Sequence, residues 1–283
     1  MATNILTMPE AASFKPLIIS APFGNYIQPI GMTPTLGTFT AAARPGRVWR
    51  ILKTVRYYPR LRAWVNKIGL RNPGIDWLVS RVDAGRIDVS DKIVSIHGFE
   101  PNDWWKLLQR VESISPLAVE MNMSCPNVGE IDWPPELFLR AQAMDVPVIV
   151  KLPPVNYDLI FEQAHEAGLR TYHCCNTLPV AAGGLSGQPL KPVALQCVRD
   201  LRTCYDDLTI IGGGGIRTVG DVDQYAEAGA DYFAIGTKVF NPKYLLSHTG
   251  LQPLLAQATR RHTASENRKA HEQESRQVEK EDA

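Results

Sequence analysis

The chain has 283 residues, of which 45% are hydrophobic and 21% charged, and its formal net charge is +1. These are ordinary values for a globular protein, and a balanced charge gives no reason to expect nucleic acid or an anionic membrane as a partner. The length suits one large domain, because α/β barrels reach this size as a single unit. We therefore predict one domain over residues 1–262, with small molecules as partners.

The chain contains five cysteines without a CxxC pair and six histidines without a metal-ligand spacing. This pattern predicts neither a disulfide framework nor a zinc or iron–sulfur site, and it fits a reducing cytoplasm. The N-terminus lacks a basic region followed by an apolar one, and no stretch approaches the roughly 20 apolar residues of a membrane-spanning helix. We expect a cytoplasmic protein without a metal ion.

Short apolar runs that end in Gly, Pro, Asn or Ser alternate with helical patterns, which favours βα units and a parallel sheet. The eight runs are Pro16–Ala21, Thr33–Thr40, Lys92–His97, Leu117–Met123, Pro147–Leu152, Arg170–Cys175, Leu208–Gly212 and Tyr232–Ile235. Eight such units predict a (β/α)8 TIM barrel, whose site lies at the carboxyl ends of the strands. An open doubly wound sheet is the alternative. The first helix is expected to be truncated, because only residues 25–32 separate the first two runs.

Two stretches depart from the βα alternation. Residues 44–70 are rich in Arg, Lys, Trp and Tyr, which we interpret as a solvated excursion in preference to a nucleic-acid-binding patch. From Thr263 to Ala283 the residues are charged and polar without apolar periodicity. That composition predicts a disordered or frayed helical tail.

Glycine-rich segments follow the last two predicted strands, in Ile210–Ile216 and Ala234–Lys238. In barrel enzymes these two loops commonly bind phosphate through backbone N–H groups, although the glycines could serve only as turn residues. Lys151 ends an otherwise apolar buried run. A buried cation needs an anion nearby, which could be a ligand such as a flavin or a structural carboxylate.

Four asparagines, Asn72, Asn122, Asn127 and Asn176, lie at predicted strand ends, where an amide can read the donor and acceptor positions of a planar ring. Each one alone could be a turn residue. Cys125 follows the fourth strand on a short loop. A free thiol there could be a general base or nucleophile, or a small buried hydrophobe.

These segments together resemble the dihydroorotate dehydrogenases. The resemblance rests on EMNMSCPNV at 120–128, VIVKLPP at 148–154, GGLSG at 183–187 with LKP at 190–192, the glycines at 212–215 and IGT at 235–237. Residues 66–76, NKIGLRNPGID, are similar to the family's substrate motif. The match covers most of residues 16–240 in the family's order.

The resemblance implies FMN as the cofactor and oxidation of the C5–C6 bond of a dihydropyrimidine, as in the conversion of (S)-dihydroorotate to orotate in pyrimidine biosynthesis. A base removes the C5 proton while a hydride leaves C6 for flavin N5, so each group needs its own face of the ring. The soluble class of the family uses Cys as the base and the membrane-associated class uses Ser. Cys125 therefore indicates the soluble class and no membrane partner.

The resemblance also assigns roles by position. The implied substrate contacts are Asn66, Gly69, Leu70, Asn72, Asn122, Asn127, Asn176 and Thr177. The implied flavin contacts are Ser20, Ser95, Asn122, Lys151, Gly187, Gly214, Gly215, Gly236 and Thr237, with Lys151 beside N1 and O2 of the ring. Cys125 is the implied catalytic base.

Three departures from the family pattern affect the surroundings of the substrate. The family has a lysine in a TKT context after the second strand, where this chain has Thr38-Phe39-Thr40, so Phe39 is expected to add bulk or stacking and to weaken binding of a carboxylate. The segment between Asn176 and Gly183 is short, which predicts that the hairpin roofing the site is truncated or missing. The first helix is also lost.

We predict an FMN-dependent oxidoreductase acting on a CH–CH bond. Two alternatives stay open: an enzyme of the same family acting on another dihydropyrimidine or an enone, and a degenerate flavin-binding subunit without catalysis. The electron acceptor could be fumarate, NAD or a partner reductase, and a homodimer is also left open.

Overall fold

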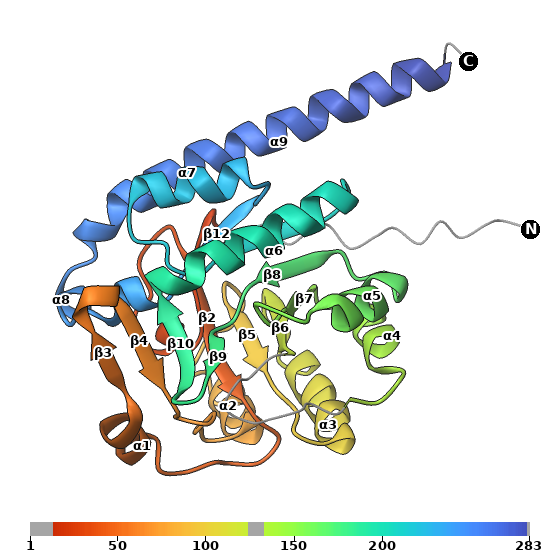
Figure 1. Cartoon of the computed structure of the whole chain (residues 1–283). Helices are drawn as coiled ribbons and strands as arrows, with labels where there is room; N and C mark the ends of the chain where they lie inside the picture. The colour runs from red at the N-terminus through yellow and green to blue at the C-terminus, as the bar shows by residue number, and fades with distance from the viewer. Residues whose placement is uncertain (1–13, 124–132, 282–283) are drawn as a thin grey trace, which may run out of the picture.

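The structure is a computed structural model that describes residues 14–123 and 133–281. Eight parallel strands close into a barrel in the order β1-β12-β11-β8-β7-β6-β5-β2 (Figure 1). They are β1 (Leu17–Ile19), β2 (Thr33–Phe39), β5 (Ile93–Ile96), β6 (Ala118–Asn122), β7 (Val148–Lys151), β8 (Thr171–Cys174), β11 (Thr209–Gly213) and β12 (Tyr232–Ile235). All eight predicted runs form these strands, and the predicted TIM barrel is confirmed.

Helices follow most barrel strands and cover the outside of the barrel (Figure 1). They are α2 (Ile75–Asp83), α3 (Pro101–Glu112), α4 (Leu137–Gln142), α5 (Asp158–Glu166), α6 (Lys191–Cys204), α7 (Val219–Glu227), α8 (Lys243–Leu246) and α9 (Gln252–Glu281). Short 3-10 turns complete them: η1 (Phe23–Asn25), η3 (Gln188–Leu190), η4 (Thr237–Phe240) and η5 (Thr249–Leu251). Only η1 separates β1 from β2, so the predicted loss of the first helix is confirmed.

A second, four-stranded antiparallel sheet lies beside the barrel, in the order β3-β4-β10-β9. Its strands are β3 (Arg56–Tyr58), β4 (Ala63–Asn66), β9 (Leu178–Val180) and β10 (Gly183–Gly187), and α1 (Arg47–Thr54) and η2 (Pro59–Leu61) flank the first pair. The stretch 44–70 is therefore structured as well as solvated. The prediction that the roofing hairpin is missing is wrong, because β9 and β10 form a short hairpin that pairs with β4.

The barrel interior is built in layers that follow the two-residue period of the strands. One layer is apolar and fully buried, with Ile93, Ala118, Ile149 and Ile211 among its members. Two residues further along the same four strands come Ser95, Glu120, Lys151 and Gly213. The interior thus changes from apolar to polar toward the carboxyl ends of the strands.

The C-terminal helix α9 continues through residue 263, where the sequence predicted the start of a tail. It packs along α7, and Ser265 and Lys269 reach Asp231 at 2.9 Å and 2.7 Å. Asp231 is 1% exposed and also pairs with Arg202 at 2.7 Å. The first part of the predicted tail is therefore joined to the barrel. The division of the chain at residue 262 into one domain and a tail stays a prediction.

Candidate active site

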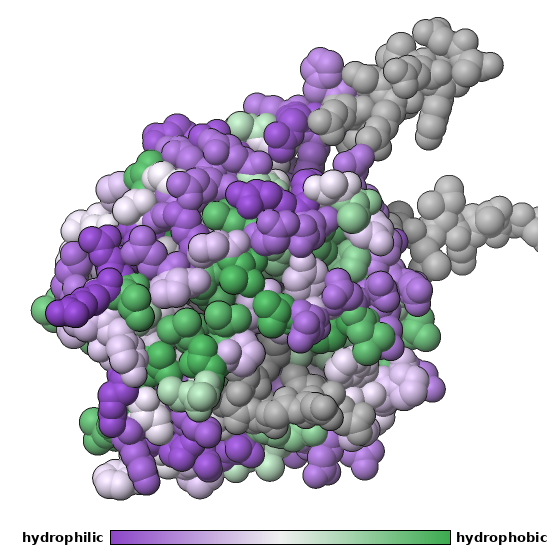
Figure 2. Space-filling view, viewed as in Figure 1, coloured by the Kyte–Doolittle hydropathy of each residue, from purple (hydrophilic) through white to green (hydrophobic). Residues whose placement is uncertain are grey.

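A cavity of about 500 Å³ lies between the carboxyl ends of the barrel strands and the four-stranded sheet. The barrel contributes residues such as Asn122, Lys151 and Gly213, and the sheet contributes Asn66 and Ser186. Ligand sites typically measure roughly 300–1,000 Å³. Apolar side chains gather in the middle of the face in Figure 2, while the surface along α9 is mostly hydrophilic. The cavity has the size and place of a TIM-barrel active site.

Most residues predicted for the site line this cavity. They are Ser20, Asn66, Gly69, Leu70, Asn72, Asn122, Lys151, Asn176, Thr177, Gly187, Gly214, Gly215, Gly236 and Thr237. Ser95 does not line it, since its side chain is fully buried behind the wall and contacts Thr38 Oγ1 at 3.0 Å. Cys125 and Asn127 lie outside the described residues.

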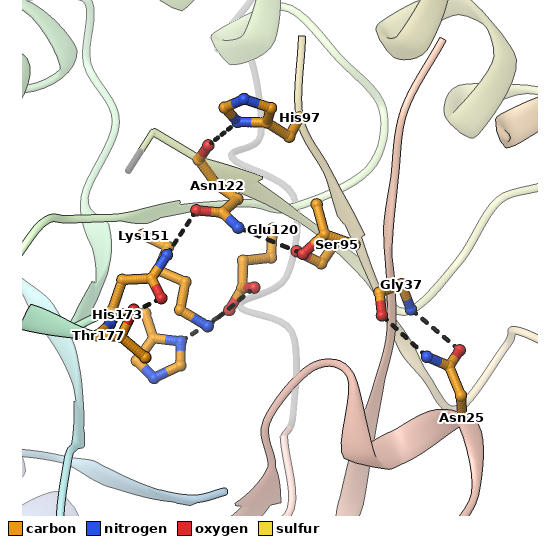
Figure 3. A network of polar contacts seen from close by, with 11 residues as sticks. Asn25, Gly37, Ser95, His97, Glu120, Asn122, Lys151, His173 and Thr177 are labelled. Atoms are coloured by element: carbon orange, nitrogen blue, oxygen red, sulfur yellow. Dashed lines mark hydrogen bonds and ion pairs between the residues drawn. The ribbon is translucent and has the colours of Figure 1, made fainter. Parts of the chain in front are cut away.

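Three buried ionisable side chains meet at the floor of the cavity. Lys151 Nζ lies 3.3 Å from Glu120 Oε1, and His173 Nδ1 lies 2.7 Å from Glu120 Oε2 (Figure 3). Exposures of 5%, 1% and 2% for Lys151, Glu120 and His173 place all three in a low-dielectric environment. Burial alone would raise the pKa of Glu120, but Lys151 and His173 outweigh it and lower that pKa to about 2. Glu120 is therefore ionised at neutral pH.

Strand register places Asn122, Lys151 and His173 side by side on three neighbouring strands. Asn122 on β6 pairs with Lys151 on β7, and Lys151 pairs with His173 on β8. The three side chains therefore stand at one level across adjacent strands. The structural carboxylate predicted as one possible partner of Lys151 is Glu120. Lys151 also lines the cavity, and a flavin as its second partner stays a prediction.

A row of polar side chains crosses the barrel rim from Asn176 to Thr38. Asn176 Nδ2 donates to Asn122 Oδ1 at 2.9 Å, and Asn122 Nδ2 donates to Thr38 Oγ1 at 3.3 Å. The Asn176 Oδ1 atom accepts from the Thr177 N–H at 2.8 Å. These bonds fix the orientation of two amides that face the cavity, which is the preorganisation needed to read a planar ring.

Asn72 is placed differently from the other predicted amides. Its Nδ2 group donates to Thr40 Oγ1 at 2.9 Å and to Leu70 O at 2.7 Å. Its Oδ1 accepts from the N–H groups of Thr40 at 3.2 Å and Gly74 at 2.8 Å. An amide has two donors and two acceptor sites, so the side chain of Asn72 is fully used in holding the 70–74 loop.

The prediction that Phe39 adds bulk or stacking to the cavity is wrong, whereas the expected weaker binding of a carboxylate stays a prediction. Its ring stacks on Trp77 of α2, with centroids 6.5 Å apart, on the outer side of the barrel wall. Gly37 and Thr38 line the cavity instead. Successive strand residues point to opposite faces, so a shift of one residue moves a side chain from one face to the other. Asn25 holds Gly37 through two bonds, of 2.8 Å and 3.1 Å (Figure 3).

Glycine backbone forms the wall opposite the amides, with Gly187, Gly214 and Gly215 at positive φ. A Cβ on Gly215 would lie 2.8 Å from Gly187 O, and one on Gly214 would lie 3.0 Å from the Cβ of Ala194. Only glycine fits this close approach of two loops. Bare backbone beside η4 suits an anionic phosphate group, so the residues present fit a phosphate-bearing cofactor.

Sequence reasoning missed Glu120 and His173 as site residues. His97 is fully buried at the end of β5, where its Nδ1 contacts Asn122 O at 2.8 Å. Desolvation lowers its pKa to about 4. The available signal was a charged or polar residue two positions beyond an apolar inward-facing one, a pattern that occurs on β5, β6 and β7 but not on β8, where Thr171 precedes His173.

Comparison with known proteins agrees with this geometry. The family model described as dihydroorotate dehydrogenase matches residues 31–249. The chain belongs to the dihydroorotate dehydrogenase family. Its relatives include "Dihydroorotate dehydrogenase B (NAD(+)), catalytic subunit" of Listeria innocua, 35% identical over 208 residues, covering 64% of this chain and 68% of the relative. The protein of the same description from Halalkalibacterium halodurans is 34% identical with the same coverage.

Solved dihydroorotate dehydrogenase structures share the fold. The ligand-free DHODH of Eimeria tenella has a TM-score of 0.68 at 20% identity and covers 87% of this chain and 84% of its own. The complex of that enzyme with ferulenol has a TM-score of 0.66 at 19% identity, with coverage of 84% and 80%. These two structures support the assignment of the TIM-barrel fold. Within residues 14–123 and 133–281, no helix has the length and apolarity needed to span a membrane.

Proposed function

We propose that this member of the dihydroorotate dehydrogenase family binds FMN in the cavity and oxidises the C5–C6 bond of dihydroorotate or a close analogue. The observation that supports this most strongly is that the family's substrate and flavin positions, placed from sequence alone, gather around one cavity. A flavin bound there would supply the hydride acceptor. The residues of the chain would bind the ring, orient it and take its proton.

In this proposal different parts of the cavity bind the phosphate, the flavin ring and the pyrimidine ring. The glycine loops at 214–215 and 236–237 hold the phosphate end, and Lys151 faces the edge of the flavin that becomes negative. Asn122 and Asn176, fixed by their mutual hydrogen bond, read the pyrimidine ring. Cys125 acts as the base on the opposite ring face, an assignment carried by the family resemblance because that residue lies outside the described ranges.

A second candidate substrate is a neutral dihydropyrimidine related to uracil. Gly37 leaves that stretch of the cavity wall without a side chain, and a Cβ there would meet Ser95 O at 2.4 Å. A cationic side chain therefore has no room at this position without movement of the backbone. A carboxylate on the substrate would have to rely on other groups, which favours an uncharged ring.

Anaerobic reduction of the FMN-loaded chain distinguishes these candidates. We expect dihydroorotate to bleach the flavin absorbance of the wild type, and Cys125→Ala to slow bleaching by roughly 10²–10⁴-fold, the usual contribution of a general base. FMN retention should be unchanged in that variant. Cys204→Ala is the matched control, because this exposed thiol at the end of α6 should leave bleaching unchanged.

The outcomes separate the hypotheses. Bleaching by dihydrouracil but not dihydroorotate would select the second substrate. Retention of FMN without bleaching by any dihydropyrimidine would favour a non-catalytic flavin subunit, and a chain that cannot be loaded with FMN would refute the proposal. Reoxidation of the bleached protein with fumarate, NAD⁺ or a quinone then identifies the acceptor, and the requirement for a second protein would identify a partner reductase.

A further inference from the structure

The imidazole of His173 is a buried titratable group that the proposed chemistry does not yet use. It stands on β8 between Lys151 on β7 and Gly213 on β11, and it lines the cavity. The charged groups that act on it are Glu120 and Lys151, and the thiol of Cys175 lines the same cavity. Burial raises the pKa of the Cys175 thiol well above its ordinary value, so Cys175 stays neutral. The local charge is therefore set by Glu120, Lys151 and His173.

The contact with Glu120 fixes which nitrogen of His173 carries a proton. Glu120 is ionised and can only accept, so His173 donates from Nδ1 across 2.7 Å. The lone pair of the neutral ring then sits on Nε2. That atom lies 3.0 Å from where a Cβ on Gly213 would stand, against the backbone that leads into the glycine wall. Nε2 thus points to the cavity side of the ring, away from its carboxylate partner.

The charge of this cluster is balanced only while His173 is neutral and the cavity holds no additional charge. Lys151 and Glu120 cancel each other at 3.3 Å. Burial, and then the charge of Lys151, lower the pKa of His173, whereas Glu120 raises it. A ligand that gains one negative charge beside Lys151 would add to the effect of Glu120 and favour the imidazolium. The same carboxylate that orients the ring also stabilises its protonated form.

We propose that His173 takes up one proton at Nε2 when the flavin in this cavity accepts a hydride, and releases it when the flavin is reoxidised. The inference rests on the proposed function. The hydride carries two electrons and one proton from C6 of the substrate to the flavin, and the base takes the proton from C5. The proton on Nε2 comes from solvent, so the protein and flavin together gain no net charge. His173 is a charge-compensating group that acts beside Lys151.

The pH dependence of the midpoint potential of the bound FMN tests this. Each proton taken up in a two-electron reduction contributes about 29.6 mV per pH unit. We expect the wild type to show a slope of two protons, about 59 mV per pH unit, and His173→Gln to show a slope of one. His97→Gln is the matched control, another buried imidazole that contacts Asn122 O but does not line the cavity, and it should keep the wild-type slope.

Counting protons in the wild type makes the test independent of any variant. Photoreduction of FMN-loaded protein in weak buffer with a pH indicator should consume two protons per flavin for two electrons. One proton per flavin, or an equal slope in wild type and His173→Gln, would overturn the role of His173 and leave the proposed function standing. A chain that binds no FMN would overturn both.

Discussion

Replacement of Glu120 by Gln tests the buried cluster directly. The substitution preserves shape but removes the only charge that compensates Lys151 among the groups described around it, with both residues at most 5% exposed. Removal of one partner from a buried ion pair typically costs about 3–5 kcal/mol. The pKa of Glu120 gives a second measure: a fall from 4.5 to about 2 corresponds to about 3 kcal/mol, at roughly 1.36 kcal/mol per pKa unit.

The sign of the pH dependence follows from the direction of that change. A carboxyl whose pKa is lower in the folded state stabilises the fold fully above its unfolded value, and this contribution is lost as pH falls through the folded value. For Glu120 the loss should occur between pH 4.5 and about pH 2. Glu120→Gln should lack this component of acid destabilisation while being less stable at pH 7.

Urea denaturation followed by circular dichroism measures both effects, using midpoints at pH 7 and at several acidic values. Glu112→Gln is the control, because Glu112 pairs with Arg140 on the half-exposed outer surface and should change stability by under about 1 kcal/mol. A Glu120→Gln variant within 1 kcal/mol of the wild type at pH 7 would refute the electrostatic account of the cluster.

Two further predictions concern other parts of the barrel. Asp231→Asn should lower the free energy of unfolding by about 3–5 kcal/mol in urea titrations, because two cationic partners lose their buried anion, whereas Asp207→Asn, on an exposed pair, should stay within about 1 kcal/mol. Gly215→Ala should cost about 1–3 kcal/mol and weaken FMN retention in gel filtration, because its Cβ would lie 2.8 Å from a cavity-wall carbonyl at φ +75°. Gly85→Ala, at φ +64° in open space, is the control that separates backbone strain from loss of FMN binding. It should lower stability and leave FMN retention unchanged. Unchanged FMN retention in Gly215→Ala would contradict the role given to the glycine wall.

The barrel could be predicted because its signal is local. Each buried strand is a short apolar run with a turn residue at its end, so Pro147–Leu152 and Leu208–Gly212 were recognisable without knowledge of their neighbours. The four-stranded sheet was not, because β3 and β4 are only three and four residues long and β4 pairs with the distant strand β10. Exposed charged residues likewise hid the helical continuity of α9.

The site shows the same division between local and non-local information. The family motifs located Lys151 and Asn122, but the contact between Glu120 and His173 joins two residues 53 positions apart and depends on strand register. Phe39 was placed on the wrong face by a shift of a single residue, and β2 is irregular there, with a change in register between Leu36 and Phe39. An irregular strand removes the period on which such an assignment depends.

The apolar layer of the barrel interior also controls how water reaches the site. Ile93, Ala118, Ile149 and Ile211 are at most 1% exposed and fill the barrel below Glu120 and His173. Protons that exchange with these two groups must therefore enter from the carboxyl-end side, through the cavity. A ligand that fills the cavity would close this route, so His173 should exchange its ring protons with solvent more slowly in the loaded protein than in the empty one.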